Sequence, residues 1–312
     1  MHMRPLSIVV ACGLAAVTAA AAPPARPPAR PGTLSVAFVG DIMLDGGPGH
    51  AIGSGRDPFA GCADLLAAAD LTVGNLECVL GKGGKQILKA YSFRAAADAP
   101  RCLARHFSAV SLANNHAYDF GPEGLLESLR ILEAEKIPCF GAGRNDAAAR
   151  RPLVLEKNGI RLALLGANAF RADAYAAGPD RAGVAPLRER EILADIAAAR
   201  QVADVVVPFV HWGPELVAQP READIALAHA MVEAGAAAVI GAHPHVTQTV
   251  DIHRGAPIVY SLGNFVFDYF PGDPAEWTGW IVTLTFTKGR GVEMATRAVV
   301  LDAEGLPRPA AE

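Results

Sequence analysis

Side chains that bind divalent metal ions follow several short apolar segments of the chain, at the points where predicted strands end. These candidate ligands are Asp41, Glu77, Asn115, His211, His243 and His245. Imidazole, carboxylate and amide oxygen together suit zinc, iron or manganese. Each residue type, taken alone at a strand end, is also common in turns and helix caps. Their recurrence at separate strand ends predicts a shared site for one or two divalent metal ions.

The segment from Ala242 to His245 places two histidines at alternate positions, with Pro244 between them. In an extended chain, alternate side chains point the same way, and a proline favours an extended conformation at the residue before it. We therefore expect His243 and His245 to face one site from extended backbone. Asn75 and Glu77 have the same spacing, so they share a face if their strand continues that far.

Alternating apolar strands and amphipathic helices must position these residues. Strands are predicted over 34–40, 70–75, 107–113, 137–140, 204–210, 236–241 and 257–262, and helices over 59–69, 121–135, 187–200 and 220–233. Lys157-Asn158-Gly159 predicts a hairpin turn between strands over 152–156 and 160–166, and 280–288 and 292–300 form a last hairpin. This pattern predicts an α/β fold with two mixed sheets packed together and helices outside. Because ligands bind at the carboxyl ends of strands in open α/β sheets, the polar residues should meet at one rim.

Composition narrows the possible partners. The chain has 312 residues, 51% hydrophobic and 19% charged, with a net charge of −4, which indicates a globular protein. The sequence has no cluster of five or more Lys and Arg residues, which argues against a nucleic-acid partner.

The first thirty residues differ from the rest. Arg4 precedes an apolar, alanine-rich stretch over 6–22, and a segment rich in proline follows. We expect a signal peptide over 1–22, a Pro-rich linker over 23–32, one domain over 33–303 and a tail over 304–312. The chain would then be exported to the periplasm or the cell exterior; an uncleaved N-terminal anchor and lipidation at Cys12 are alternatives. Export permits disulfides, but the sequence leaves open any pairing among Cys62, Cys78, Cys102 and Cys139.

Six ordered segments resemble the CapA family of capsule or poly-γ-glutamate synthesis proteins. They are Phe38–Leu44, Gly74–Glu77, Ala113–Gly121, His211–Gly213, Gly241–His245 and Ser261–Phe265, within a match over roughly residues 34 to 300. The family is similar to the calcineurin-like metallophosphoesterases. This resemblance implies a four-layer α/β/β/α sandwich and a two-metal centre.

The resemblance also implies individual roles. Asp41 and His245 would bind the first metal, and Asn115, His211 and His243 the second. His116 would act as a general acid or stabilise developing negative charge, and Asp119 would orient His116.

Two positions depart from the superfamily pattern. Met43 stands where a histidine ligand is expected, and Asn75, a neutral amide, stands where an aspartate bridges the metals. Two neighbouring cations need an anion between them, so Glu77, two residues further on, is the candidate replacement. CapA-like proteins share this Asn-x-Glu form.

Two functions fit these residues. The first is a metal-dependent hydrolase, phosphoesterase-like, that cleaves a phosphoester or an amide of a surface polymer such as poly-γ-glutamate. The second is a non-catalytic accessory component of membrane-associated polymer synthesis or export, with a structural or polymer-binding metal site. Contacts to an anionic substrate are expected from Asn75, Asn114, Lys85 and Asn264.

Two segments near the predicted site have competing interpretations. The loop over 81–85, with Lys89 and Arg94, could receive an anion, or it could be a solvated loop. The aromatic residues over 268–280 could form a rim beside the site, or they could pack in the core.

Overall fold

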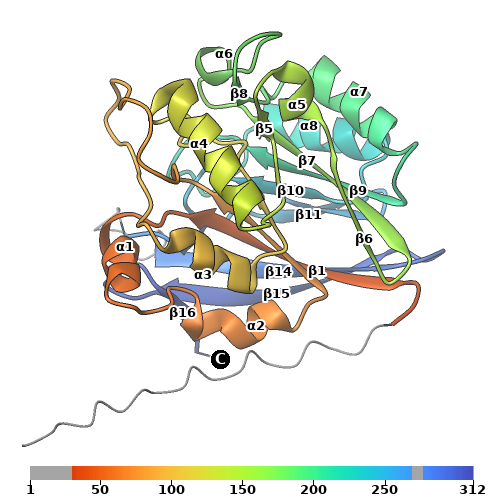
Figure 1. Ribbon diagram of the computed structural model, residues 1–312. Coiled ribbons are helices and arrows are strands. Elements are labelled where there is room, and N and C mark those ends of the chain that lie inside the picture. The colour runs from red at the N-terminus through yellow and green to blue at the C-terminus, as the bar shows by residue number, and fades with distance from the viewer. Residues whose placement is uncertain (1–29, 269–276, 312) are drawn as a thin grey trace, which may run out of the picture.

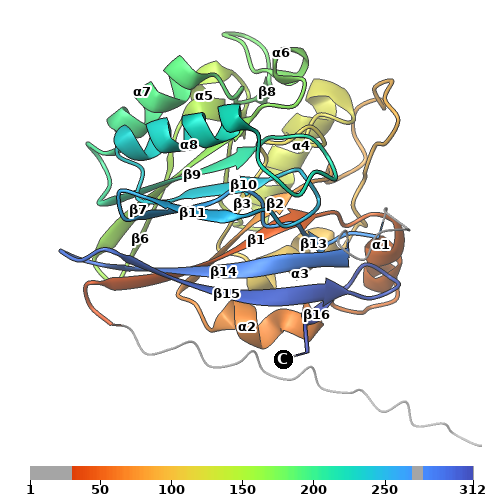
Figure 2. The ribbon, with the colours of Figure 1, turned by 180° about the vertical axis from the view of Figure 1, so that it is seen from behind.

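Two β-sheets packed face to face form the centre of the computed structural model, which describes residues 30–268 and 277–311 (Figures 1 and 2). The first sheet has the order β16-β15-β14-β1-β2-β3-β4, and β13 pairs with β1. Its strands are β1 (Thr33–Ile42), β2 (Leu71–Leu76), β3 (Ala109–Ser111), β4 (Cys139–Phe140), β13 (Asn264–Val266), β14 (Thr278–Thr287), β15 (Val292–Leu301) and β16 (Pro307–Pro309). Strands β1 to β4 are parallel, and β14 to β16 extend the sheet in antiparallel fashion.

The second sheet has the order β11-β12-β10-β9-β7-β6. Its strands are β6 (Leu153–Lys157), β7 (Ile160–Asn168), β9 (Val205–His211), β10 (Val239–Ala242), β11 (Val250–His253) and β12 (Ala256–Val259). Strands β7, β9, β10 and β12 run parallel, and β6 and β11 are antiparallel neighbours at the two edges. A separate antiparallel pair joins β5 (Ala142–Gly143) to β8 (Gly183–Val184).

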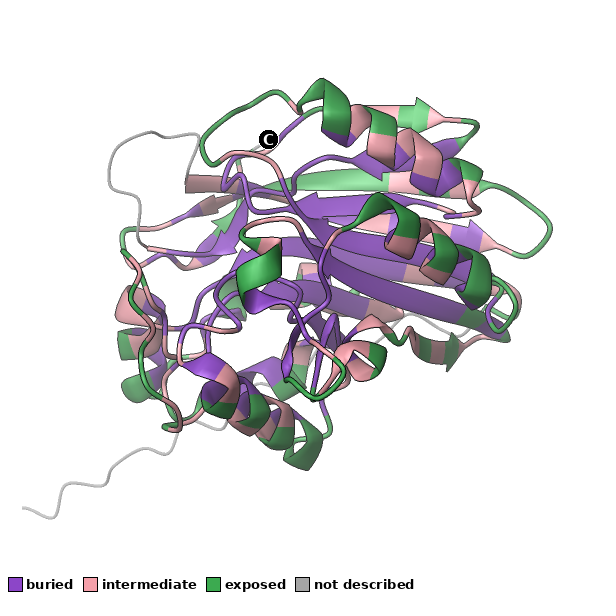
Figure 3. Ribbon diagram, turned by 90° about the horizontal axis from the view of Figure 1, so that it is seen from above, coloured by how far each residue is buried: buried purple, intermediate pink, exposed green. Residues whose placement is uncertain are grey.

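Helices cover the outer face of each sheet, and Figure 3 shows exposed residues mainly on these helices and on loops, around buried strands. The first sheet is covered by α1 (Gly46–Gly53), α2 (Ala63–Ala67), α3 (Ala99–His106) and α4 (Gly121–Ala134), and the second by α7 (Glu189–Ala199) and α8 (Glu222–Glu233). Two short helices, α5 (Asp146–Arg150) and α6 (Ala172–Tyr175), flank the β5–β8 pair. The predicted α/β/β/α sandwich is therefore confirmed.

The apolar core between the sheets holds these layers together. Phe38 of β1 meets Phe209 of β9 edge to face, with ring centroids 6.2 Å apart, and both side chains are buried. Burial of one such side chain contributes about 1.5–3 kcal/mol. Strands with apolar side chains on both faces are thereby fixed in place, and the polar residues that follow them are held at the edge of the sheets.

The predicted hairpin turn at Asn158-Gly159 is confirmed, and the helix predicted over 59–69 is wrong. Asn158 and Gly159 have φ angles of 54° and 78°, as a hairpin turn of this type requires. The single helix expected over 59–69 is instead a 3₁₀ turn, Ala60–Cys62, followed by the short α2. Gly61 lowers helix propensity, and a Cβ there would lie 2.3 Å from the carbonyl oxygen of Pro307, so strand β16 sets the path of this segment.

The cysteines in the described residues form no disulfide. Cys62, Cys78, Cys102 and Cys139 are all free thiols, and burial raises the pKa of Cys62 to about 12. None of the helices within 30–268 and 277–311 combines the length and apolar character that crossing a membrane requires. The predicted signal peptide and most of the predicted linker lie outside the described residues.

Candidate metal centre

The six predicted ligands meet at one edge of the sandwich, where strands of both sheets end. Asp41 pairs in register with Asn75 of β2 and with Asn264 of β13, and His211 pairs with Ala242, the residue before His243. The six side chains are at most 3% exposed. The pairing of the strands therefore brings together candidate ligands that lie as far apart in the sequence as Asp41 and His245.

Two overlapping groups have ligand atoms that all lie within 4.8 Å of one another. One consists of Glu77, His243 and His245, and the other of Asp41, Glu77 and His211. Glu77 belongs to both groups, so its carboxylate occupies the position expected of a bridging anion. Asn115 completes the set, because its Oδ1 lies 2.7 Å from Nε2 of His211.

Two of these side chains have no hydrogen-bond partner among the described residues. Both carboxylate oxygens of Glu77 and both ring nitrogens of His243 are buried and unsatisfied. Burying such a group without a partner costs about 1–3 kcal/mol, and more for a charged group. A divalent cation held between a carboxylate and imidazoles would satisfy them, so the residues present fit a metal ion.

The charges of the site also favour a cation. Burial and the neighbouring carboxylate of Asp41 raise the pKa of Glu77 well above its ordinary value. Burial alone would raise the pKa of Asp41 too, but hydrogen bonds and charge interactions, mainly with His245, lower it. Burial lowers the pKa of His211 well below its usual range, and lowers that of His243 to about 3. Neutral imidazoles beside carboxylates are the forms that bind metals.

The backbone around Pro244 differs from the prediction. His243 has a φ angle of 100° and His245 one of 59°, so neither residue is extended. The backbone N–H of His243 donates to Oδ2 of Asp41 over 3.2 Å, which holds the start of a tight turn after β10. The two imidazoles still converge, with ring centroids 5.9 Å apart. Such left-handed backbone costs about 1–3 kcal/mol per residue and clusters at functional sites.

Asn75 and Asn114 form a scaffold beneath these ligands. The Nδ2 group of Asn75 donates to Oδ1 of Asp41 over 2.7 Å and lies 3.2 Å from Nδ1 of His211. Its Oδ1 accepts from Nδ2 of Asn114 over 2.9 Å. Asn114 in turn accepts from the backbone N–H groups of His116 and Ala117. These contacts favour a positioning role over the predicted contact with substrate.

Asn264 also contacts a candidate ligand. Its Oδ1 lies 2.9 Å from Nδ1 of His245, and the same nitrogen lies 3.3 Å from Oδ2 of Asp41. Asn264 therefore fixes the orientation of the imidazole.

The predicted catalytic pair lies beside the metal ligands. Nδ1 of His116 is 2.8 Å from Oδ2 of Asp119, and Nε2 of His116 is 3.9 Å from Oε1 of Glu77. The ring of Phe93 packs against the imidazole with a centroid distance of 4.3 Å. His116 thus has one nitrogen held by a carboxylate and the other directed at the centre of the site.

Lys89, which the sequence marked only as part of a possible anion-binding loop, lies within this site. Its ammonium group lies 2.5 Å from Oδ1 of Asp119, 3.1 Å from the carbonyl oxygen of Asn115 and 3.3 Å from Nδ1 of His116. Its side chain is only 9% exposed. The sequence signal was weak, because Lys89 stands in an irregular loop 30 residues from its carboxylate partner.

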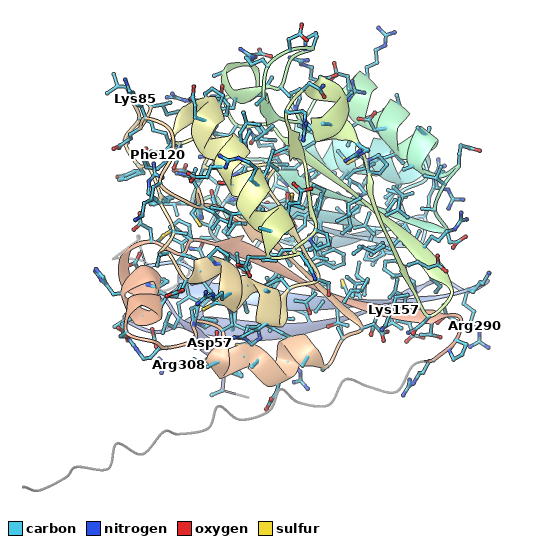
Figure 4. The ribbon with its side chains drawn as sticks, viewed as in Figure 1. Asp57, Lys85, Phe120, Lys157, Arg290 and Arg308 are labelled. Carbon is cyan, nitrogen blue, oxygen red and sulfur yellow. The ribbon has the colours of Figure 1, made fainter. Side chains whose placement is uncertain are left out.

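Lys85 is exposed on the loop that precedes Lys89 (Figure 4), and its predicted contact with substrate stays a prediction. Arg94 has a structural role, because its guanidinium donates to the carbonyl oxygens of Gly81 and Gly83 and lies 3.5 Å from the ring centroid of Phe120.

In the aromatic segment, Trp277 and Trp280 pack against the apolar core, which agrees with the core-packing interpretation. Tyr269 and Phe270 lie outside the described residues.

Comparison with known proteins places this site in a family. Residues 35–269 match the family described as bacterial capsule synthesis protein PGA_cap. The chain is 33% identical over 245 residues to the PGA biosynthesis protein CapA of Bacillus subtilis, covering 75% of this chain and 63% of that protein. It is 31% identical over 215 residues to a Mycobacterium tuberculosis protein named "Probable polyglutamine synthesis accessory protein", covering 65% of this chain and 57% of that one. The chain thus spans less than two thirds of these relatives' own length.

A solved structure shares the architecture. A 5'-nucleotidase precursor from Thermus thermophilus superposes with a TM-score of 0.52 over 88% of this chain and 56% of that one, at 13% sequence identity. At this identity the similarity concerns the fold, which is that of the metallophosphoesterases. The family match and the fold agree, and the chain belongs to the bacterial capsule synthesis (CapA, PGA_cap) family.

Proposed function

We propose that this protein is an exported, metal-dependent hydrolase that acts in the metabolism of capsule or poly-γ-glutamate at the cell surface. The observation that carries the proposal is the pair of buried, unsatisfied groups at Glu77 and His243, which lie beside the catalytic candidate His116. A purely structural cluster would have its polar atoms satisfied within the protein. The family relatives support the polymer as the setting of the reaction.

The candidate ligands divide by position around Glu77. The family resemblance assigns Asp41 and His245 to one ion and His211, His243 and Asn115 to a second, whereas the ligand atoms group as Glu77, His243 and His245 and as Asp41, Glu77 and His211. In both divisions Glu77 would offset the repulsion between the two ions. A bound divalent ion lowers the pKa of a coordinated water to near neutrality and polarises the bond to be cleaved. Manganese, iron and zinc all suit this donor set.

His116 would assist departure of the leaving group. Asp119 holds Nδ1 and leaves Nε2 directed into the site. Burial lowers the pKa of His116, although Asp119 opposes that shift. An anionic substrate group beside Nε2 would favour the protonated imidazole, because opposite charges stabilise each other. His116 could then donate its proton to a leaving oxygen or nitrogen, or stabilise negative charge on the reacting group.

Lys89 would keep this pair in place. Its ammonium group bridges Asp119 and the carbonyl oxygen of Asn115, which connects the catalytic pair to a candidate ligand. The substrate would be a phosphoester or an amide of an anionic surface polymer. Either substrate is anionic, and the exposed Lys85 is the predicted contact for its charge.

A second candidate function is a non-catalytic accessory role in polymer synthesis or export. The observation in its favour is Asn75, a neutral amide whose hydrogen bonds to Asp41 and Asn114 leave it no part in bridging two cations. The mycobacterial relative is named as a probable accessory protein of polyglutamine synthesis. In this role a single metal would order the site or hold polymer carboxylates, and the partner would be membrane-associated synthesis machinery.

The two functions are separated by His116→Ala, assayed on p-nitrophenyl phosphate, bis-p-nitrophenyl phosphate and a γ-linked glutamate oligomer. A hydrolase should lose turnover by about 100-fold or more, the usual contribution of a general acid, while metal content stays at the wild-type value. The matched control is His253→Ala, since His253 lies on β11, where it pairs with Glu233 over 3.1 Å and stacks on His229. Absence of turnover in the wild type with manganese, iron and zinc, or full activity of His116→Ala, would refute the proposed mechanism.

A further inference from the structure

A second cavity lies at the opposite end of the sandwich from the metal centre. It has a volume of about 700 Å³ and is formed by the starts of β7, β9 and β12 together with the turn between β14 and β15. Val205, the first residue of β9, lines this cavity, and His211, the last residue of β9, belongs to the metal centre. At a rise of about 3.3 Å per residue, the two sites lie roughly 20 Å apart along that strand.

The lining of this cavity is positively charged. It contains five cationic side chains, namely Arg161, Arg200, Arg254, Lys288 and Arg290, against two carboxylates, Asp204 and Glu233. The whole chain has a net charge of −4, so these cations are not a consequence of overall composition. Concentration of one sign of charge in a concave surface attracts ligands of the opposite sign.

The two carboxylates engage only part of this charge. Arg161 forms a two-pronged ion pair with Asp204, over 3.0 and 3.2 Å, and Arg254 pairs with Glu233 over 2.8 Å. Arg200 donates to the backbone carbonyl oxygen of Asp204. Within residues 30–268 and 277–311, Lys288 and Arg290 have no carboxylate within ion-pair distance. Both charges are therefore available to a ligand.

The entrance to the cavity is open and held in a fixed position. Lys288 and Arg290 stand on the turn between β14 and β15, whose backbone is tied to the body because the N–H of Lys288 donates to the carbonyl oxygen of Gly32. No other atom lies within 4 Å of a Cβ built on Gly289, Gly291 or Gly255. Figure 4 shows Arg290 at the outer end of this turn, on the other side of the molecule from Lys85.

The cavity also has an apolar component. Phe286 and Val292 of the hairpin and Val205 of β9 contribute to its lining. A ligand with several anionic groups joined by methylene-containing units would match both features, because its acids meet the cations and its linkers cover the apolar surface. The volume of the cavity lies within the range that is usual for ligand pockets, about 300–1,000 Å³.

We propose that this cavity is a second binding site that holds a polycarboxylate chain, separate from the metal centre and independent of metal. The choice of a glutamate polymer as the ligand rests on the proposed function, whereas the cavity and its charge do not. Binding at both ends of one domain would retain a long polymer near the metal centre through a raised effective concentration.

The test is fluorescence anisotropy of a labelled γ-linked glutamate decamer in the presence of EDTA, at 50 and 200 mM salt. The double variant Lys288→Ala/Arg290→Ala should bind about tenfold more weakly than the wild type, which is ~1.4 kcal/mol. Affinity should also fall with salt, and the fall should be smaller in the variant. The control is Arg130→Ala/Arg190→Ala, which removes two exposed arginines of α4 and α7.

Three results would overturn this proposal. The first is that the wild type does not bind the decamer, and the second is that both double variants bind it equally well. The third is that inorganic phosphate at equal total charge displaces the decamer, because that result would indicate a site for small anions in general. Binding to phosphatidylglycerol vesicles without binding to the decamer would assign the surface to a membrane instead. Because EDTA removes metal, this binding assay does not depend on the hydrolase proposal. A failure of the hydrolase proposal can therefore be distinguished from a failure of the cavity proposal.

Discussion

Replacing Glu77 with glutamine should change the stability of the metal-free and metal-loaded protein in opposite directions. Glu77 is fully buried next to Asp41, with both carboxylate oxygens unsatisfied among the described residues. Burial and Asp41 raise the pKa of Glu77, so between its unfolded and folded pKa values the folded state binds more protons. Stability of the metal-free protein must then fall as pH rises through that window. Each pKa unit of such a shift costs about 1.4 kcal/mol, and Glu77→Gln removes that cost.

The metal-loaded protein should respond in the other direction. Metal at 100 times its Kd stabilises the folded state by ~2.7 kcal/mol. If loss of the charged ligand weakens binding about 100-fold, the same metal concentration gives only ~0.4 kcal/mol. At roughly 2–4 °C per kcal/mol, metal should raise Tm by about 5–10 °C in the wild type and by about 1 °C in Glu77→Gln.

The assay is thermal unfolding at pH 7 with EDTA and with manganese or zinc. The control is Glu135→Gln, an exposed carboxylate at the end of α4, which should behave as the wild type does. The reasoning is refuted if Glu77→Gln lowers the Tm of the metal-free protein by several degrees, or if metal raises the Tm of both proteins equally.

Three further substitutions follow from the structure. Asn75→Asp loses a donor to the carboxylate of Asp41 and adds a like charge, so it should lower the Tm of metal-free protein but increase the Tm gained on adding metal. Lys89→Met leaves Asp119 buried without its cation, and should destabilise the fold by about 3–5 kcal/mol, measured by urea unfolding. Gly241→Ala would place a Cβ 2.0 Å from the carbonyl oxygen of Tyr260, which should shift the backbone at the metal centre and greatly reduce soluble expression.

Each of these outcomes has a matched comparison. Asn75→Ala removes the same donor without adding charge. If metal raises the Tm of Asn75→Asp and Asn75→Ala equally, a carboxylate at position 75 does not bridge the metals. Lys82→Met changes an exposed lysine of the same loop, and an equally large loss of stability there would show that the Lys89 effect is not due to Asp119. Gly53→Ala is the control for Gly241, because a Cβ at Gly53 meets nothing within 4 Å.

The arrangement of strands around the site follows from patterns visible in the sequence. Each candidate ligand stands directly after an apolar run, and such runs become buried strands whose polar ends must meet at an edge. The same reasoning placed the hairpin at Asn158-Gly159 correctly, because only a few residue types adopt its positive φ angles.

Features that depend on contacts distant in sequence could not be predicted in this way. His243 and His245 have positive φ angles in a turn whose first N–H, that of His243, donates to Asp41 about two hundred residues earlier. Lys89 reaches Asp119 only through the fold of an irregular loop. The cationic cavity likewise combines the starts of three strands with a hairpin turn, and none of these segments has a motif of its own.

Metal content of the purified protein is the most direct test of the proposed centre. Protein incubated with manganese, iron and zinc and then freed of unbound metal would be measured by mass spectrometry, beside His243→Ala and the half-buried control His253→Ala, which lies on β11. The unsatisfied ring nitrogens of His243 mean that its removal breaks no hydrogen bond within the described residues. We predict one or two equivalents of a transition metal in the wild type and control, and a loss of at least one equivalent in His243→Ala. No bound metal in the wild type, or full occupancy in His243→Ala, would contradict the assignment of this site as a metal centre.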